Sequence, residues 1–224
     1  MKKCEPFADT VLPWLTCLTM LAALSMVFLY VPTERVQGVV QRVFYFHLPA
    51  AWMSFLGFFI VAGASASFLW QGNRASDLLA QAAAEVGMVF CTLVLMTGSL
   101  WARPIWGVWW TWDPRLTMVA ILWTIYAAYI LLRNLGGDNE LIARYAAVLG
   151  IVGVLDIPIL YIAVRLWRGI HPKVERMAPE MAWTLLVCTA AFLCLFTWLL
   201  WLRLRSLSLR DEVAALRRQA LALS

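Results

Sequence analysis

Six long apolar stretches constrain the fold of this chain more than any other feature of its sequence. Each has roughly the 20 residues that an α-helix needs to cross the ~30 Å hydrocarbon core of a bilayer. The chain is 63% hydrophobic and only 14% charged, whereas a soluble domain carries about 25% charged residues. We therefore expect an all-α integral membrane protein with six transmembrane helices, over residues 11–31, 47–70, 78–101, 116–135, 142–164 and 181–202.

Short polar connections separate these stretches and indicate a single membrane domain over residues 1–224. Backbone groups in lipid must be satisfied within the spanning element, and no alternating pattern suggests a barrel, so the spans are predicted to be helices. Turn residues at 71–74, 135–139 and 169–172 mark three of the breaks, and neighbouring helices are expected to pack antiparallel. Residues 203–224 carry an apolar stripe at helical spacing, which suits a membrane surface, a partner helix or a simple extension of the last span.

Charge and cysteine content exclude several classes of function. The net charge of +5 is modest for a membrane protein and is better explained by anionic lipid headgroups or anionic ligand groups than by nucleic acid, for which no recognition fold is found. The five cysteines form no CxxC pair, so neither a disulfide framework nor a zinc site is predicted. The run 11–31 is too long for a typical signal peptide and is interpreted as an uncleaved first span.

The distribution of basic residues gives an expected orientation. With the N-terminus inside, ten Lys and Arg residues lie on the inner side and eight on the outer side, which predicts a cytoplasmic N-terminus and a cytoplasmic C-terminal helix. The cationic outer face has two explanations. Its arginines pair with Glu34, Asp113, Glu175 and Glu180, or some of them await an anionic ligand.

A cluster of tryptophans lies between the third and fourth apolar stretches. Trp106, Trp109, Trp110 and Trp112 fall within seven residues, followed by Asp113. A buried Trp covers about 150–250 Å², so these rings need a cover of lipid, protein or a large flat apolar ligand. An interfacial aromatic belt would scatter its rings over many helix ends, and the concentration here favours a ligand-binding surface.

Two histidines, the only ones in the chain, lie on the same membrane face as this cluster. An odd number of crossings separates His47, the tryptophan segment and His171 from the N-terminus, whichever way the protein is oriented. Imidazole is a common axial ligand of haem iron, and guanidinium pairs well with carboxylate. The pattern predicts a porphyrin site with His47 and His171 on the iron, and with Arg115 and either Arg42 or Arg103 on the propionates.

The sequence also resembles a known family. The segment WGVWWTWDPRLT (106–117) is similar to the tryptophan-rich "WWD" signature of haem-handling membrane proteins. FHLPAAW (46–52) and TGSLW (97–101) resemble one branch, the cytochrome c maturation protein C family (CcmC, also called haem exporter protein C). The similarity covers nearly the whole chain, including the number of helices.

This resemblance implies a haem carrier rather than an enzyme. In the family, haem b is presented at the periplasmic face of the bacterial inner membrane and passed to the haem chaperone CcmE, for attachment to c-type cytochromes. The ABC subunits CcmA and CcmB and the small protein CcmD assist. The two outer histidines, here His47 and His171, are taken as the axial ligands. The residues that match the haem platform are Trp106, Gly107, Trp109, Trp110, Trp112 and Asp113.

Two other hypotheses remain open at this point. A haem-bearing electron-transfer subunit of a quinone oxidoreductase generally carries histidines within its spans, whereas neither histidine of this chain lies deep in a span. A purely structural permease subunit of an ABC exporter would retain no cofactor. Two acids in the apolar stretches, Glu85 and Asp156, are not assigned to the haem site. Glu85 is expected near the inner interface, and Asp156 in a buried polar network.

Overall fold

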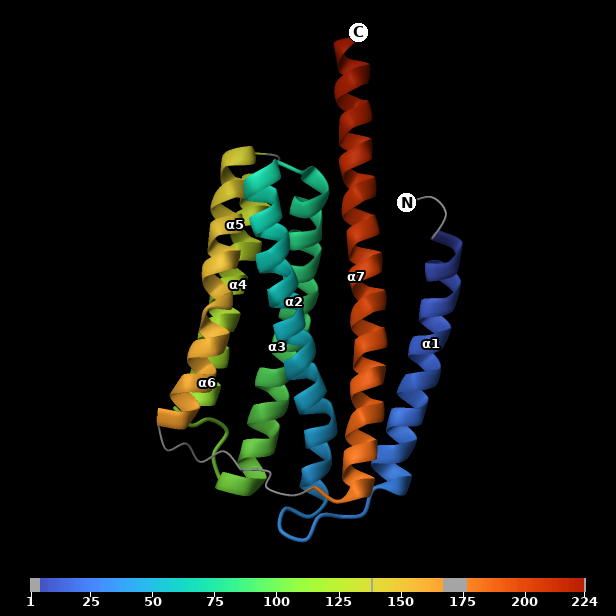
Figure 1. The fold of residues 1–224 in the computed structure, drawn as a ribbon, viewed down its shortest axis with the longest axis vertical. Coiled ribbons are helices and arrows are strands. Elements are labelled where there is room, and N and C mark those ends of the chain that lie inside the picture. The colour runs from blue at the N-terminus through green and yellow to red at the C-terminus, as the bar shows by residue number, and fades with distance from the viewer. Residues whose placement is uncertain (1–4, 138, 167–176, 224) are drawn as a thin grey trace.

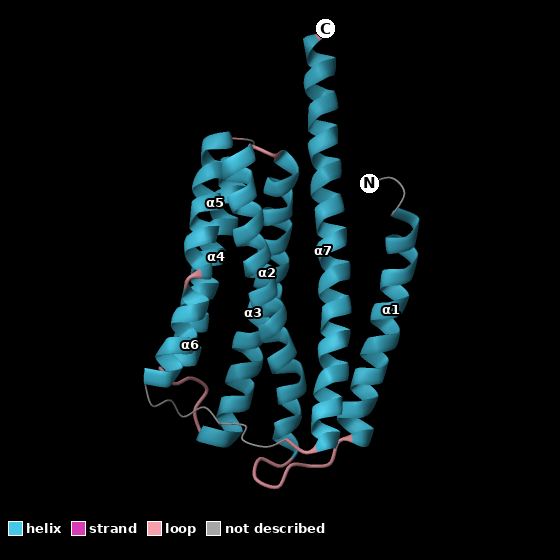
Figure 2. Cartoon of the chain, viewed as in Figure 1, coloured by secondary structure: helices cyan, strands magenta, loops and turns pink. Residues whose placement is uncertain are grey.

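A computed structural model describes residues 5–137, 139–166 and 177–223, and these residues form helices and connecting loops without a sheet (Figure 2). Six of the described helical segments are long and apolar enough to cross a membrane, which confirms the predicted number of spans. In chain order the elements are α1 (Glu5–Ser25), the π-helical turn η1 (Met26–Tyr30), the 3-10 helix η2 (Val39–Val43), α2 (Phe44–Gln71), α3 (Arg74–Trp106), α4 (Pro114–Gly136), α5 (Glu140–Val154), α6 (Asp156–Leu166) and α7 (Pro179–Ala222).

The helices form a bundle of α2 to α6 with α1 and α7 beside it (Figure 1). Helix α2 packs along α3 and α5, α4 packs on α3, α5 and α6, and α7 joins α1 to α2 and α3. At the centre, the ring of Phe58 stacks on the ring of Tyr126 with centroids 3.7 Å apart. The Tyr126 hydroxyl donates a hydrogen bond of 2.9 Å to the Gly150 carbonyl, so α2, α4 and α5 meet at one buried tyrosine.

The two ends of the bundle carry different loops (Figure 1). Residues 31–43 and 107–113 lie at one end, which we call the tryptophan end. Residues 72–73, 137 and 139 lie at the other, the tail end, beyond which α7 projects. The prediction that His47 and the tryptophan segment share one face is confirmed, because α2 begins and α3 ends at the tryptophan end. His171 lies outside the described residues.

Single glycine and asparagine residues determine where the helices terminate and begin at the tail end. Gly72, at φ +66°, ends α2, since a residue without a Cβ adopts this left-handed conformation readily. The Asn73 side chain accepts a hydrogen bond from the Ala75 N–H, and the Asn139 side chain accepts one from the Leu141 N–H. Each asparagine satisfies one of the amide groups left free at a helix N-terminus, so the breaks predicted at 71–74 and 135–139 are confirmed.

The fifth predicted span is confirmed as one segment long and apolar enough to cross a membrane, Glu140–Ala163, but Leu155 interrupts it between two helices. Helix α5 ends at Val154 and α6 begins at Asp156. Pro158 explains the break, because it has no N–H for the Val154 carbonyl and its ring clashes with that group. Asp156 is 6% exposed and occupies the first turn of α6, where the positive end of the helix dipole favours its carboxylate. In the described part of the chain its Oδ2 has no hydrogen-bond partner.

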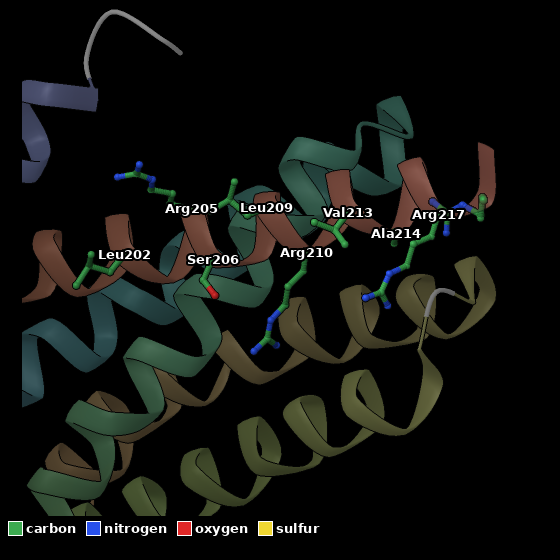
Figure 3. Close-up of a pocket in the computed structure, with 9 residues that line it drawn as sticks. Leu202, Arg205, Ser206, Leu209, Arg210, Val213, Ala214 and Arg217 are labelled. Atoms are coloured by element: carbon green, nitrogen blue, oxygen red, sulfur yellow. The ribbon is translucent and has the colours of Figure 1, made fainter. Parts of the chain in front are cut away.

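The C-terminal segment is helical, as predicted. Helix α7 continues without interruption from the last span to Ala222, which supports the hypothesis of an extension. Figure 3 shows a shallow hollow along this extension, and all the residues that line it come from α7 itself, among them Arg205, Leu209, Arg210 and Val213. The hollow is therefore one exposed face of a helix, and none of the predicted site residues contributes to it.

Candidate functional site

His47 lies in the first turn of α2 and faces α3. Its Nδ1 is 2.9 Å from the Thr97 Oγ1. The Trp101 ring meets the imidazole edge to face, with centroids 5.8 Å apart and planes at 71°. Both partners belong to α3 and are four residues apart, so they lie on one face of that helix. The imidazole is thereby held on two sides at the interface of α2 and α3.

Gly98 brings the start of α4 next to the same imidazole. A Cβ added at Gly98 would lie 3.3 Å from His47 Cε1 and 3.7 Å from Leu116 Cδ2. Leu116 is in the first turn of α4, directly after the tryptophan segment. The segment therefore leaves α3 at Trp106 and returns toward the level of His47 before α4 begins, which places its C-terminal end beside the predicted ligand.

The tryptophan segment presents two exposed indoles. Trp106 is the last residue of α3, and Gly107 ends that helix at φ +75°. Trp109 is 57% exposed and Trp112 is 82% exposed, whereas Trp110 is half-buried and meets Trp112 edge to face at 5.9 Å. Exposed rings of this size offer a flat apolar contact surface outside the packed core of the bundle.

Asp113 is a structural residue of this segment. Its carboxylate is the N-cap of α4 and accepts a hydrogen bond of 2.9 Å from the Arg115 backbone N–H. Pro114 follows at the first helical position, where its missing N–H costs nothing. The sequence Asp-Pro therefore fixes the residue at which α4 begins. Asp113, which was predicted to bind the cofactor, is only 6% exposed.

The three predicted arginines have different surroundings. The Arg42 guanidinium lies 5.9 Å from the Phe28 ring centroid, and its Nε is buried without a hydrogen-bond partner in the described structure. Arg103 donates a hydrogen bond to the Gly107 carbonyl and so closes the end of α3. The Arg115 side chain is half-buried. In the described ranges none of the three forms an ion pair.

Glu34, expected to pair with an arginine of this face, instead stabilises a turn. The backbone N–H of Gln37 donates to its carboxylate, and this hydrogen bond holds the pKa of Glu34 below its ordinary value. A second backbone N–H, from Val36, donates over 2.8 Å. The turn places the Gln37 Oε1 3.0 Å from the Trp101 Nε1, so loop 31–43 supports the ring that packs on His47.

Sequence reasoning missed the supporting residues of this site. Thr97, Gly98 and Trp101 lie in a segment that was noted for its resemblance only, without a contact assigned to it. Their spacing on one helix face was readable, but the partner on α2 was not, because Thr97 and His47 are 50 residues apart.

The acids and arginines of the tail end form ion pairs that tie α7 to the bundle. The Glu85 carboxylate lies 2.5 Å from Arg203 Nε and 2.8 Å from Arg203 Nη2. Arg205 bonds Asp9 of α1, and Arg74 lies 2.7 Å from Asp211. These pairs are remote from His47 and stabilise the arrangement of the helices.

Comparison with known proteins identifies relatives of the whole chain. The family model described as "Heme exporter protein C" (CcmC) matches residues 2–219. A protein of that name from Bradyrhizobium diazoefficiens is 36% identical over 218 residues, which cover 92% of this chain and 82% of the relative. The Escherichia coli K12 protein is 35% identical over 83% of this chain and 77% of its own, and the Rhodobacter capsulatus protein 34% identical over 94% and 89%. The chain therefore belongs to the haem exporter protein C family.

Proposed function

We propose that this protein binds haem b at the tryptophan end and presents it to a haem chaperone for the maturation of c-type cytochromes. The observation that carries this proposal is the juxtaposition at Gly98, where the His47 imidazole lies beside the first turn of α4 and hence beside the tryptophan segment. The relatives of this chain are named for haem export. An imidazole can ligate haem iron, and the exposed indoles beside it can contact the apolar porphyrin ring.

The residues present fit a haem. The iron is already held by the macrocycle, so the protein has to supply one or two axial ligands. In the described residues no group of three His, Cys, Asp or Glu side chains could hold a free metal ion. The indoles of Trp109 and Trp112 offer flat apolar area, and the buried Arg42 Nε offers an unused donor for an acidic rim.

Each predicted residue then has a role in holding the cargo. His47 and His171 would ligate the iron. Arg42 and Arg115 take the propionates, while Arg103, Gly107 and Asp113 fix the ends of the tryptophan segment. Trp106, Trp109, Trp110 and Trp112 form the platform. Because the indoles are exposed, the cargo stays accessible from the side and can leave, which a delivery protein requires.

The proposed setting follows from the same assignment. The tryptophan end faces the periplasm, and both termini lie in the cytoplasm, as the basic residues of the α7 extension favour. CcmE receives the haem, and CcmA, CcmB and CcmD form a complex with this chain in the bacterial inner membrane. The protein acts as a carrier and presenter, and bond formation belongs to the haem and its acceptor.

Absorption spectra of the purified, haem-loaded protein test this function. We expect His47→Ala and His171→Ala each to alter the haem bands of the wild type, because each removes an axial ligand. The matched control is Tyr145→Phe, an exposed α5 residue outside the site, which should leave the bands unchanged. Spectra identical to wild type in both histidine variants would refute the ligand assignment, and a preparation that takes up no haem would refute the function.

A further inference from the structure

We propose that Thr97 is a positioning residue that fixes the His47 imidazole in the Nδ1–H form and so presents Nε2 as the nitrogen that binds iron. The inference rests on the proposed function for the identity of the ligand, but the tautomer is a property of the protein alone. It can therefore be measured without haem.

The direction of the hydrogen bond follows from the other contact of the Thr97 hydroxyl. Thr97 Oγ1 lies 2.6 Å from the Leu93 carbonyl oxygen, one turn earlier in α3. A carbonyl oxygen only accepts, and a hydroxyl has one hydrogen to give. The Thr97 hydrogen is therefore committed to Leu93, and toward His47 the oxygen acts as an acceptor. Nδ1, at 2.9 Å, must carry the hydrogen.

The tautomer decides which nitrogen can coordinate a metal. A neutral imidazole with its hydrogen on Nδ1 carries its coordinating lone pair on Nε2, the ring nitrogen that does not contact Thr97. A hydrogen bond donated from the opposite nitrogen also orients the ring and raises the basicity of the ligand. Thr97 thus supports metal binding by His47 in the way that the outer partners of metal-bound histidines do.

The packing around the ring restricts its rotation. Trp101 closes one side of the imidazole, and Trp101 is itself held by the Gln37 side chain from loop 31–43. Gly98 allows the ring to approach α3, since a Cβ there would lie 3.3 Å from Cε1. The ring therefore has one orientation in which Nδ1 reaches Thr97.

A simpler explanation is that the Thr97 hydroxyl only donates a hydrogen bond to the carbonyl one turn earlier in its helix. The Thr124 hydroxyl does this with the Ala120 carbonyl at 2.8 Å. Thr124 lies exposed in α4 and makes the same kind of contact with a backbone carbonyl one turn earlier. Thr124→Val is therefore a matched control for Thr97→Val. Thr97→Ser is the conservative variant, because it keeps the acceptor oxygen.

Nitrogen NMR of the haem-free protein, with ¹⁵N in the histidine rings, gives the first readout. The chain has two histidines, so His171→Gln assigns the signals of His47. At a pH where the ring is neutral, we expect the hydrogen of His47 on Nδ1 in the wild type, in Thr97→Ser and in Thr124→Val, and a mixture of both tautomers in Thr97→Val. A wild-type ring with its hydrogen on Nε2 would overturn the inference even if no variant folded.

Haem titration and the midpoint potential give the second readout. We expect Thr97→Val to weaken haem binding about 10–100-fold, the usual loss when a partner of a metal ligand is removed, and to raise the midpoint potential. Thr97→Ser and Thr124→Val should match the wild type. If His47→Ala changes the haem spectrum but Thr97→Val changes neither tautomer nor affinity, the positioning role is refuted and the proposed function stands. If His47→Ala leaves the haem spectrum unchanged, the ligand assignment is refuted instead. The NMR measurement on the haem-free protein still tests whether Thr97 sets the tautomer of His47.

Discussion

Asp77 of α3 and Arg133 of α4 form an ion pair of 2.8 Å at the tail end of the bundle, where only 3% and 4% of their side chains are exposed. Arg74 reaches the same Asp77 oxygen over 2.7 Å. Arg133 Nη2 also lies 3.4 Å from the Gln81 Oε1. One carboxylate therefore neutralises a buried guanidinium and joins two helices that the sequence does not bring together locally.

Removing this carboxylate should destabilise the fold. Asp77→Asn leaves the Arg133 charge buried without its counter-ion, and breaking a buried pair in this way costs about 3–5 kcal/mol. The measurement is thermal or denaturant unfolding in detergent, followed by circular dichroism. The control is Glu140→Gln, which makes the same chemical change in the exposed pair with Arg144 and should cost less than about 1 kcal/mol. Equal losses from the two variants would contradict the importance of the buried pair.

The contact of α2 with α3 should depend on two glycines. A Cβ added at Gly57 would come within 2.9 Å of the Gly87 Cα and 3.3 Å of the Ala83 carbonyl oxygen. Backbone atoms cannot move aside cheaply, so Gly57→Ala should destabilise the protein by about 1–3 kcal/mol. Gly63→Ala, on the same helix with nothing within 4 Å of the new Cβ, should be neutral or slightly stabilising because alanine favours helix. The same unfolding assay compares the two variants. If Gly57→Ala were as stable as Gly63→Ala, the contact between α2 and α3 would accommodate the added Cβ, and the prediction would be wrong.

Gly98→Ala should affect haem binding more than stability. Its Cβ would press on His47 Cε1, and the ring must shift away from Thr97 to make room. We expect about tenfold weaker haem binding, the scale of loss when the support of a metal ligand is disturbed. Haem titration measures the affinity, and Gly63→Ala again serves as the control. Unchanged affinity with an unchanged melting temperature would show that the ring position is not critical.

The exposed indoles should matter for haem and not for the fold. Replacing Trp109 and Trp112 together by alanine removes the apolar platform, and we expect haem binding to weaken by at least tenfold while the melting temperature stays near the wild-type value. Trp70→Ala is the matched control, because Trp70 is 90% exposed at the opposite end of α2. Haem titration of the three proteins makes the comparison. A similar loss in Trp70→Ala would indicate a general effect of surface tryptophans.

The helices themselves were readable from the sequence, because the signals that form them are local. Apolar stretches of membrane-spanning length gave six spans, and the observed helices extend a few residues past the predicted limits at most ends. Asn73, Asn139 and Asp113-Pro114 begin helices where short polar residues satisfy free amide groups. The break before α6 was also readable, since Pro158 disrupts the turn that precedes it, but the apolar run around it was interpreted as one helix.

The sequence predicted that His47 and the tryptophan segment lie at the same end of the bundle, but not the contacts between helices at that end. Counting crossings placed His47 and the tryptophan segment at one end, since a helix that spans a bilayer must exit on the other side. The sequence did not show that the tryptophan segment returns toward Gly98, because this return depends on the depth in the bundle at which α4 begins relative to α3.

By itself, the sequence determined which segments are helical, how many times the chain crosses the membrane and which loops share a face, because these properties depend on residues close together in the chain. Only the tertiary structure decided that Thr97 holds His47 and that Asp77 neutralises Arg133. Such pairs depend on the rotation and depth of each helix against its neighbours, which the packing of the whole bundle sets at once.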